Sequence, residues 1–221
     1  MLSNWLALIL AFAYVLVAIG LGEAIRRRLR ASSDFTRKFI HIAVGMISVP
    51  TVLWFSDVRW AIIPPLAFVI LNYLDYRFGL IQAMLSSNRS NLGTVYFPLS
   101  FAAVLLLFWG YPTAPTEHGR TIVAVLMPLT WGDALAAIVG ERFGRRRYAL
   151  LGQTRSLEGS AAMWVASLLT TVLALGALTP ANWLIALVVA LGATLAEALS
   201  PWGIDNLTVP AVSALILGMT L

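Results

Sequence analysis

The sequence has no cysteine and very little charge. Without cysteine it contains no disulfide framework, no thiolate nucleophile and no zinc–thiolate site. Charged residues make up 11% of the 221 residues, against roughly 25% in ordinary soluble domains. Hydrophobic residues make up 60%, and the mean hydropathy is +0.85. So few charged side chains cannot cover a soluble fold of this length, and we therefore expect an integral membrane protein.

The motifs of common soluble enzymes are also missing. The phosphate-binding motif Gly-x-x-x-x-Gly-Lys-Ser/Thr is excluded because the only lysine, Lys38, follows Arg37. No Gly-x-Ser-x-Gly, His-Glu-x-x-His or protein-kinase loop signature occurs in the sequence. A nucleotide, if bound, must therefore occupy a site of a membrane-protein type.

Apolar runs predict the fold. A spanning helix needs about 20 mostly apolar residues, and polar or turn-forming breaks divide the chain into such runs. Residues 1–22 are interpreted as a signal anchor, because positive charge follows the run rather than precedes it. The prediction is an all-α polytopic helix bundle of about eight spans, forming a single transmembrane domain over residues 1–221. The spans are expected near residues 1–22, 38–56, 58–75, 94–110, 120–140, 157–177, 181–200 and 206–221.

The basic residues predict the orientation. Counted over alternating loops, thirteen Lys and Arg side chains fall on one side and only Arg59 and Arg120 on the other. Positive loops stay in the cytoplasm, so the N-terminus is expected outside a plasma membrane that the chain crosses several times. The net charge of +5 is thus a topology signal, and no nucleic-acid partner is expected.

Five carboxylates lie at or near cytoplasmic span ends. Acids in spans are costly and mark functional sites by default, although residues at span ends also reach water by snorkelling. A transporter would place such groups near the midplane, whereas this pattern indicates a site that faces the cytoplasm. The five are Asp75, Asp133, Glu158, Glu197 and Asp205.

Asp133 heads a stripe of very small side chains. At 100° per residue, Ala137, Gly140 and Gly144 lie within about 40° of Asp133 on a helix. One interpretation is close helix packing of the small-xxx-small kind. The other is a pocket in which a ligand lies against bare backbone while the carboxylate holds a metal ion.

Three further clusters lie at span starts. Arg155 and Ser156 open a span, where free N–H groups and a guanidinium suit phosphate, although Ser156 also fits an ordinary helix cap. Glu158 at the same place is compatible with phosphate if Mg²⁺ or an arginine lies between them. In the second span, Arg37 and His41 share a helix face beside Lys38, and anchoring by positive charge explains His41 poorly. Asp205 and Asn206 begin the last span, where either could also cap the helix.

These clusters together resemble the CTP-dependent polyprenol kinase family, which includes dolichol and phytol kinases, and are distantly similar to CDP-diacylglycerol synthases. The resemblance covers roughly residues 35–215. Arg155 stands where the family usually has lysine, which exchanges a point charge for a planar fork. The matching segments are Arg37-Lys38-x-x-His41, Asn91-Leu-Gly93-Thr94-Val-Tyr96-Phe-Pro98, Asp133-x-x-Ala136-x-x-x-Gly140-x-x-x-Gly144, Ser156-Leu-Glu158-Gly159-Ser160 and Asp205-Asn206-Leu-Thr-Val-Pro210.

The resemblance implies transfer of the γ-phosphoryl group of CTP to a membrane isoprenoid alcohol, with Mg²⁺ as cofactor. The expected catalytic residues are Asp133, Glu158 and His41. The expected nucleotide-binding residues are Arg37, Lys38, Ala137, Gly140, Gly144, Arg155, Ser156 and Asn206. The expected metal ligands are Asp133, Glu158, Asp205 and Glu197. The alternatives are a cytidylyltransferase like the CDP-diacylglycerol synthases and a small lipid or solute transporter; the sequence also leaves open whether the protein forms a homodimer.

Overall fold

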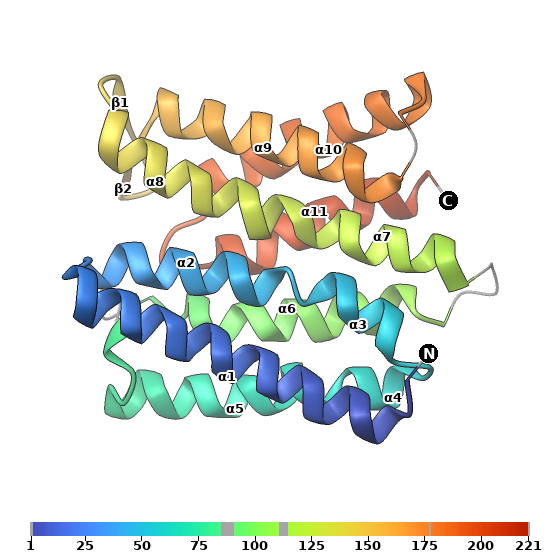
Figure 1. Ribbon diagram of the computed structural model, residues 1–221. Helices are drawn as coiled ribbons and strands as arrows, with labels where there is room; N and C mark the ends of the chain where they lie inside the picture. Colours follow the sequence, from blue (N-terminus) through green and yellow to red (C-terminus); the bar gives the residue numbers. More distant parts are fainter. Residues whose placement is uncertain (1, 85–90, 111–114, 177, 221) are drawn as a thin grey trace.

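The apolar runs fold into helices that lie lengthwise beside one another, as Figure 1 shows for the computed structural model. The structure describes residues 2–84, 91–110, 115–176 and 178–220. Within these residues, eight rods of one or more helices match the eight expected spans, which confirms the all-α polytopic membrane bundle. The rods are α1 (Asn4–Leu29); α2 (Ser33–Gly45) with α3 (Ser48–Trp54); α4 (Val58–Ala61) with α5 (Ile63–Phe78); α6 (Gly93–Phe108); α7 (Pro115–Met127) with η2 (Pro128–Asp133) and α8 (Ala134–Phe143); α9 (Leu157–Leu175); α10 (Pro180–Ala198); and α11 (Asp205–Gly218).

Five of the rods contain helices that are long and apolar enough to cross a membrane. They comprise residues 4–29, 58–78, 118–143, 157–175 and 180–198. The helices α6 and α11 are apolar but shorter. The side chains that face outward from the bundle include many large hydrophobic ones, such as Ile9, Leu106 and Leu184. A lipid environment accounts for this exposure, because water would penalise it.

Three of the rods are interrupted where the sequence predicted continuous helix. The break between α2 and α3 lies at Met46 and Ile47, and α5 begins with Pro64 and Pro65 in its first turn, where proline needs no N–H partner. The segment η2, from Pro128 to Asp133, is a π-helix inside the span of residues 118–143. Such π-turns widen a helix locally and often occur at functional sites.

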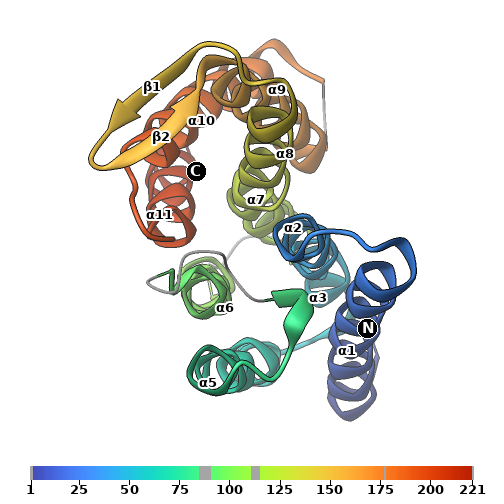
Figure 2. The ribbon, with the colours of Figure 1, turned by 90° about the vertical axis from the view of Figure 1, so that its left-hand side faces the viewer.

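A short antiparallel hairpin joins α8 to α9, where the sequence indicated only a polar break. Strand β1 (Arg147–Leu150) pairs with β2 (Gln153–Ser156), and Tyr148 lies opposite Arg155. Leu151 and Gly152 make the turn with φ of 47° and 76°, the left-handed pair that a two-residue hairpin turn requires. Figure 2 shows the hairpin projecting over the end of the bundle that faces the viewer.

That end of the bundle collects the chemistry-bearing residues. The C-terminal ends of α1, α5, α8 and α10 lie there, together with the N-terminal ends of α2, α6, α9 and α11. All the described basic residues of the larger predicted set therefore lie at this end, while Arg59 and Arg120 lie at the other end with both termini. Arg89, also in the larger set, is outside the described residues. Fully buried Phe55, Leu105, Ile122 and Val189 form part of the main hydrophobic core of the bundle.

Candidate active site

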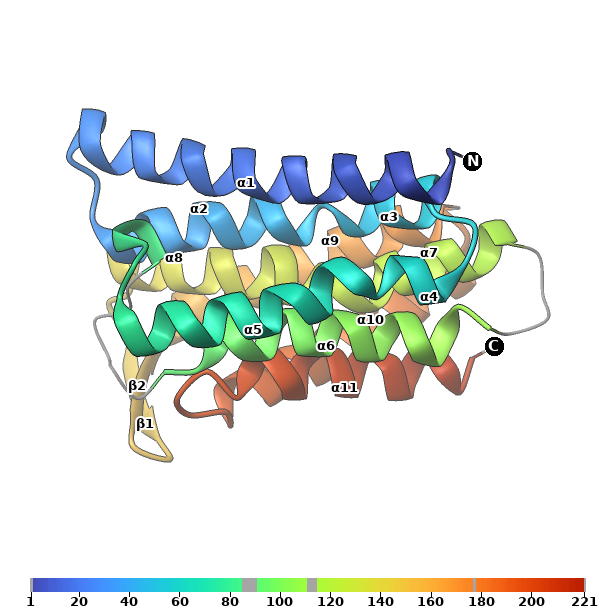
Figure 3. The same ribbon diagram turned by 90° about the horizontal axis from the view of Figure 1, so that it is seen from below.

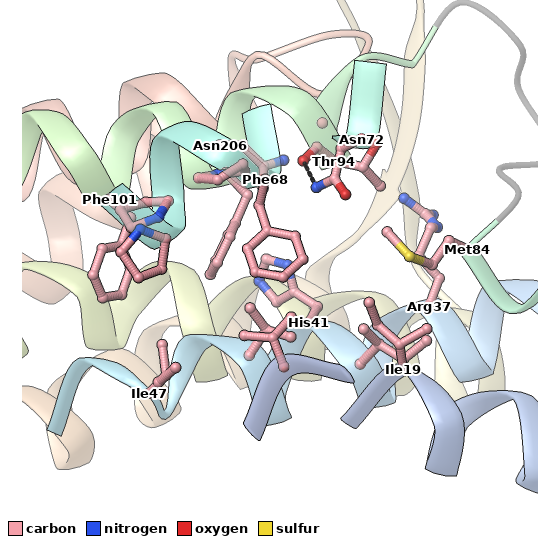
Figure 4. A pocket seen from close by; sticks show the side chains of 18 of the residues that line it. Ile19, Arg37, His41, Ile47, Phe68, Asn72, Met84, Thr94, Phe101 and Asn206 are labelled. Carbon is pink, nitrogen blue, oxygen red and sulfur yellow. Dashed lines mark hydrogen bonds between the residues drawn. The ribbon is translucent and has the colours of Figure 1, made fainter. Parts of the chain in front are cut away.

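Two cavities of opposite character reach into the bundle. The first, here called the apolar cavity, lies between α1, α2–α3, α4–α5 and α6 and includes about 950 Å³ of empty space, counting its open part. Its wall includes Val15, Ile40, Phe68, Phe97 and Phe101, and Figure 4 shows its side chains from close by. Its lining suits a hydrocarbon chain.

The second, the polar cavity, lies at the hairpin end of the bundle between α8, β2, α9, α10 and α11. It includes about 1220 Å³ of empty space on the same measure. Ala137 and Gly140 line it from α8, Arg155 from β2 and Asp205 from α11. Its lining, with several charged side chains and exposed backbone, suits a charged ligand.

The two cavities meet at four shared residues. Arg37, Lys38, Asp133 and Asn206 line both of them. They come from α2, the end of η2 and the start of α11, three segments far apart in the sequence. A ligand in the apolar cavity and a ligand in the polar cavity would therefore touch at these four side chains.

A buried ion pair stands at this junction. The Nζ of Lys38 donates to Oδ2 of Asp133 at 2.6 Å, and Nε2 of His41 lies 3.5 Å from the same oxygen. The side chains of Asp133 and Lys38 are only 5% and 13% exposed. A buried carboxylate needs such a partner, because its desolvation is otherwise uncompensated. The only lysine of the chain thus holds the acid that heads the small-residue stripe.

His41 is oriented by the π-helix. Its Nε2 lies 2.8 Å from the carbonyl oxygen of Leu129; because a carbonyl only accepts, Nε2 carries a proton. The ring also packs edge-on against Phe97, with the centroids 4.7 Å apart. His41 also lines the apolar cavity, next to Asp133.

Arg155 is tied to the end of α10 across the polar cavity. Its Nη1 pairs with the Glu197 carboxylate, its Nη2 donates to the Ser200 carbonyl at 2.8 Å, and Asp205 lies at 4.0 Å. Its Nε, like the Nε of Arg37, is buried without a hydrogen-bond partner among the described residues. Both arginines line the polar cavity, and guanidinium groups are suited to bind phosphate.

A tight turn before α11 places Asp205 and Asn206. Oδ1 of Asp205 accepts from both the backbone N–H and Nδ2 of Asn206 at 2.9 Å, and Ser100 donates to the Asn206 carbonyl. Gly203 has φ of 85°, and a Cβ there would lie 2.6 Å from the backbone nitrogen of Gly93. Glycine is therefore needed for this turn to approach α6 so closely.

Two of the five predicted acids point elsewhere. Glu158 accepts from the backbone N–H groups of Arg145 and Arg146 at 3.1 and 3.2 Å and so closes the loop before β1. Asp75 accepts from the N–H of Ile81 at 2.7 Å and shapes the turn after α5. Neither lines the polar cavity, whereas Asp133, Glu197 and Asp205 do. The structure therefore brings three of the five acids together.

The small-residue stripe serves close packing and the cavity at once. A Cβ on Gly159 would lie 2.8 Å from the carbonyl oxygen of Ala136 and 3.2 Å from Cα of Gly140, so α8 and α9 touch through backbone. Gly144 packs against Ser156, whose Oγ caps α9 by accepting from Gly159 at 3.0 Å. Ala137, Gly140 and Ser156 nevertheless line the polar cavity. The stripe thus packs closely and also borders a cavity, and the binding of a ligand or a metal ion there stays a prediction.

Several lining residues escaped the sequence interpretation. The backbone and side chains of Gln153, Thr154, Ser160 and Ser200 line the polar cavity, because the hairpin and the end of α10 enclose it. In the apolar cavity Asn72 donates to the Thr94 carbonyl at 2.7 Å, as Figure 4 shows. Ser200 and Ser160 lie within or beside the clusters already noted, but nothing in the sequence alone indicated the hairpin residues.

The acids of the polar cavity fit a nucleotide-bound magnesium ion rather than a metal held by the protein alone. The described residues contain no group of three or more His, Asp or Glu side chains that could hold a metal ion. Mg²⁺ in nucleotide sites needs only one or two carboxylates, because phosphates and water supply its other ligands. Asp133 and Asp205 both line the polar cavity and meet that smaller requirement.

Comparison with known proteins adds a consistent result. The chain is 35% identical to a phytol kinase of Synechocystis over 97% of its own length and 91% of the relative's. It is 28% identical to a probable chloroplastic phytol kinase of Triticum aestivum over 95% of its length and 74% of the relative's. No family model matches the chain, and no solved structure matches it.

Proposed function

The chain belongs to the phytol kinase family, and from this membership and the meeting of the two cavities we propose that it is a CTP-dependent kinase of a membrane isoprenoid alcohol. The observation that carries the proposal is the set of four residues common to both cavities. An alcohol with a hydrocarbon tail fits the apolar cavity, and a nucleoside triphosphate fits the polar one. The reacting hydroxyl and the γ-phosphate then meet beside Lys38 and Asp133.

Phosphoryl transfer depends mostly on positioning and on stabilising charge. The hydroxyl oxygen of the alcohol attacks the γ-phosphorus and its proton is released to water, while the bond from that phosphorus to the bridging oxygen breaks and CDP leaves. Asp133 orients the hydroxyl, and Lys38, which holds Asp133 at 2.6 Å, adds positive charge beside the transferring group. Arg37 and Arg155 supply guanidinium donors to the phosphate chain.

The proposed reaction uses Mg²⁺ as its cofactor. Asp133 and Asp205 would hold it, with Glu197 near the same wall but already paired with Arg155. The ion would neutralise charge on the β- and γ-phosphates. Arg155 stands between Glu197 and Asp205, which keeps these two acids compatible with a bound triphosphate.

We further propose that the protein spans a plasma membrane and that its polar cavity opens on the cytoplasmic side. The basic residues at the hairpin end support this orientation, because positive loops remain in the cytoplasm. The alcohol then reaches the apolar cavity from the surrounding lipid, and CTP reaches the polar cavity from water.

One assay tests the proposal. Purified protein is incubated with γ-labelled CTP, Mg²⁺ and farnesol, phytol or a polyprenol, and the products are separated into lipid and water-soluble fractions. Label in a lipid monophosphate, with CDP formed in equal amount, is the expected result. Label in pyrophosphate, in a parallel reaction with phosphatidic acid as the acceptor, would instead identify a cytidylyltransferase, and unconsumed CTP with every acceptor would favour a transporter. Parallel reactions with ATP and UTP determine whether CTP is the preferred donor.

A further inference from the structure

The apolar cavity has a closed far end. The cavity begins at the four residues that it shares with the polar cavity and extends along the helices away from them. The lining residues furthest from that start are Ala11 in α1, Thr51 in α3 and Ala61 in α4. All three are small and buried, with exposures of 1%, 4% and 1%. We call these three residues the floor of the apolar cavity. Fully buried Phe55 lies in the short connection between α3 and α4, beside this end.

Aromatic pairs join α1 to the α4–α5 rod near the floor. Trp5 of α1 and Trp60 of α4 stack edge to face with centroids 4.7 Å apart, and Phe12 of α1 and Phe68 of α5 lie 5.7 Å apart. Figures 1 and 3 both show α1 and the α4–α5 rod close together at this end and further apart towards the other. A chain lying in the cavity therefore meets a wall at the floor and more open sides near Ile19 and Asn72, which also line it.

The depth of the cavity follows from helix geometry. A helix rises ~1.5 Å per residue, so the path from Lys38 to Thr51 covers about 20 Å and that from Asn72 to Ala61 about 16 Å. A carbon–carbon bond of ~1.5 Å advances an extended chain by about 1.25 Å. An extended C20 prenol is then about 19 Å long, a C10 prenol about 9 Å and a C55 polyprenol more than about 50 Å.

We propose, on the basis of the kinase function proposed above, that Ala11, Thr51 and Ala61 set the chain length of the alcohol. With its hydroxyl at Asp133, a C20 prenol reaches the floor and fills the cavity. A C10 prenol leaves the far half unfilled and loses the burial of its missing carbons. A long polyprenol cannot be enclosed, because its tail must leave through the open side. The site is therefore selective for alcohols of about four isoprene units.

The test compares alcohols within each variant. For wild type, kcat/KM is measured with geraniol, farnesol, geranylgeraniol and a C55 polyprenol in the same detergent, and a maximum at C20 is expected. In Ala11→Leu the floor is raised, and the ratio of kcat/KM for C20 to that for C10 should fall at least tenfold. This ratio does not depend on how much of the variant is folded, since both substrates report on the same active molecules.

Ala7→Leu is the matched control. Ala7 lies one turn from Ala11 on the same helix and is equally buried, at 0% exposure, but does not line the cavity; its ratio should stay within twofold of wild type. If Ala11→Leu yields no folded protein, Thr51→Leu raises the floor from α3 instead, and the same fall in the ratio of kcat/KM for C20 to that for C10 is expected.

The outcomes separate the two proposals. The chain-length proposal would be wrong if all four alcohols were phosphorylated at similar kcat/KM, or if Ala11→Leu and Ala7→Leu gave the same ratio of kcat/KM for C20 to that for C10. Either result would leave the proposed kinase function unaffected. Failure to phosphorylate any alcohol would overturn the kinase function, and the floor with it.

Discussion

The Lys38–Asp133 pair combines a structural role and a chemical one in two side chains. The pair joins α2 to the end of η2 across 95 positions of sequence, and both partners are nearly enclosed. Removing one partner leaves the other charge buried without compensation, whereas removing both leaves a neutral site. Loss of activity through misfolding and loss through chemistry can therefore be separated experimentally at this pair.

Three variants separate the loss of stability from the loss of catalysis. Asp133→Asn should reduce kcat at least a thousandfold, equivalent to about 4 kcal/mol of transition-state stabilisation. Lys38→Met should leave the Asp133 carboxylate unpaired and lower the free energy of unfolding by about 3 kcal/mol. The double variant Lys38→Met/Asp133→Asn should regain most of that stability in detergent but no activity. Thermal unfolding and the labelled-CTP assay measure the two effects.

Asp75→Asn and Arg146→Ala are the controls for these three variants. Asp75 is a buried acid that only orders a turn, and asparagine can still accept that hydrogen bond. The Arg146 side chain is exposed and lies outside both cavities. Both should keep activity near that of wild type. An Asp133→Asn protein retaining more than a tenth of wild-type activity would remove Asp133 from the centre of the site.

At the level of elements, the polar cavity depends on how closely α8 and α9 approach. Gly140 and Gly159 let the two backbones touch, and the hairpin between these helices then carries Arg155 towards α10. Glu158 fixes the loop before the hairpin through two backbone N–H groups. The position of the Arg155 guanidinium thus depends on the glycine packing between α8 and α9 and on the hairpin that carries this arginine.

Substitution of Gly159 tests this dependence. In Gly159→Ala the new Cβ meets the rigid Ala136 carbonyl, so α9 must shift, at a cost of about 1–3 kcal/mol, and the KM for CTP should rise more than fivefold. Gly20→Ala is the control, because nothing lies within 4 Å of a Cβ at that glycine of α1. Thermal unfolding measures the stability of the two variants, and CTP saturation curves measure their KM. An unchanged KM for CTP in folded Gly159→Ala would contradict the proposal that the polar cavity depends on the close approach of α8 and α9.

The same elements show what the sequence could predict. Long apolar runs, and arginines that fall in alternate loops, are local signals in the sequence. The rods and the grouping of the basic residues at one end could therefore be predicted from the distribution of apolar and basic residues along the chain. The hydropathy pattern does not mark the break at Met46, the π-helix at Pro128–Asp133 or the hairpin. The partners of Asp133 and Arg155 lie 95 and 42 positions away, and no spacing rule on one helix relates them. The sequence predicted Glu158 as a catalytic residue and a metal ligand, but its carboxylate accepts hydrogen bonds from the backbone N–H groups of the loop before β1.

Over the whole molecule, charge and cavities divide the bundle along its length. The polar cavity, the hairpin and the described residues of the large basic set lie at one end, and both termini lie at the other. The apolar cavity extends from the polar end towards the opposite end. If the basic end faces the cytoplasm, the nucleotide binds from that side while the hydrocarbon chain stays within the thickness of the membrane. If this orientation is wrong, cytoplasmic CTP cannot reach the polar cavity, and the proposed reaction is wrong as well.

Because the chain has no cysteine, single introduced cysteines can test the orientation in intact cells. Leu151→Cys places a thiol at the tip of the hairpin, where the native side chain is 60% exposed, and Met219→Cys places one near the C-terminus, at a position 79% exposed. A membrane-impermeant maleimide should label Met219→Cys in intact cells but Leu151→Cys only after permeabilisation. The cysteine-free parent controls for background, and labelling of both after permeabilisation shows that each thiol is reachable. The reverse pattern would put the polar cavity on the outside, away from cytoplasmic CTP, and would contradict the proposed kinase reaction.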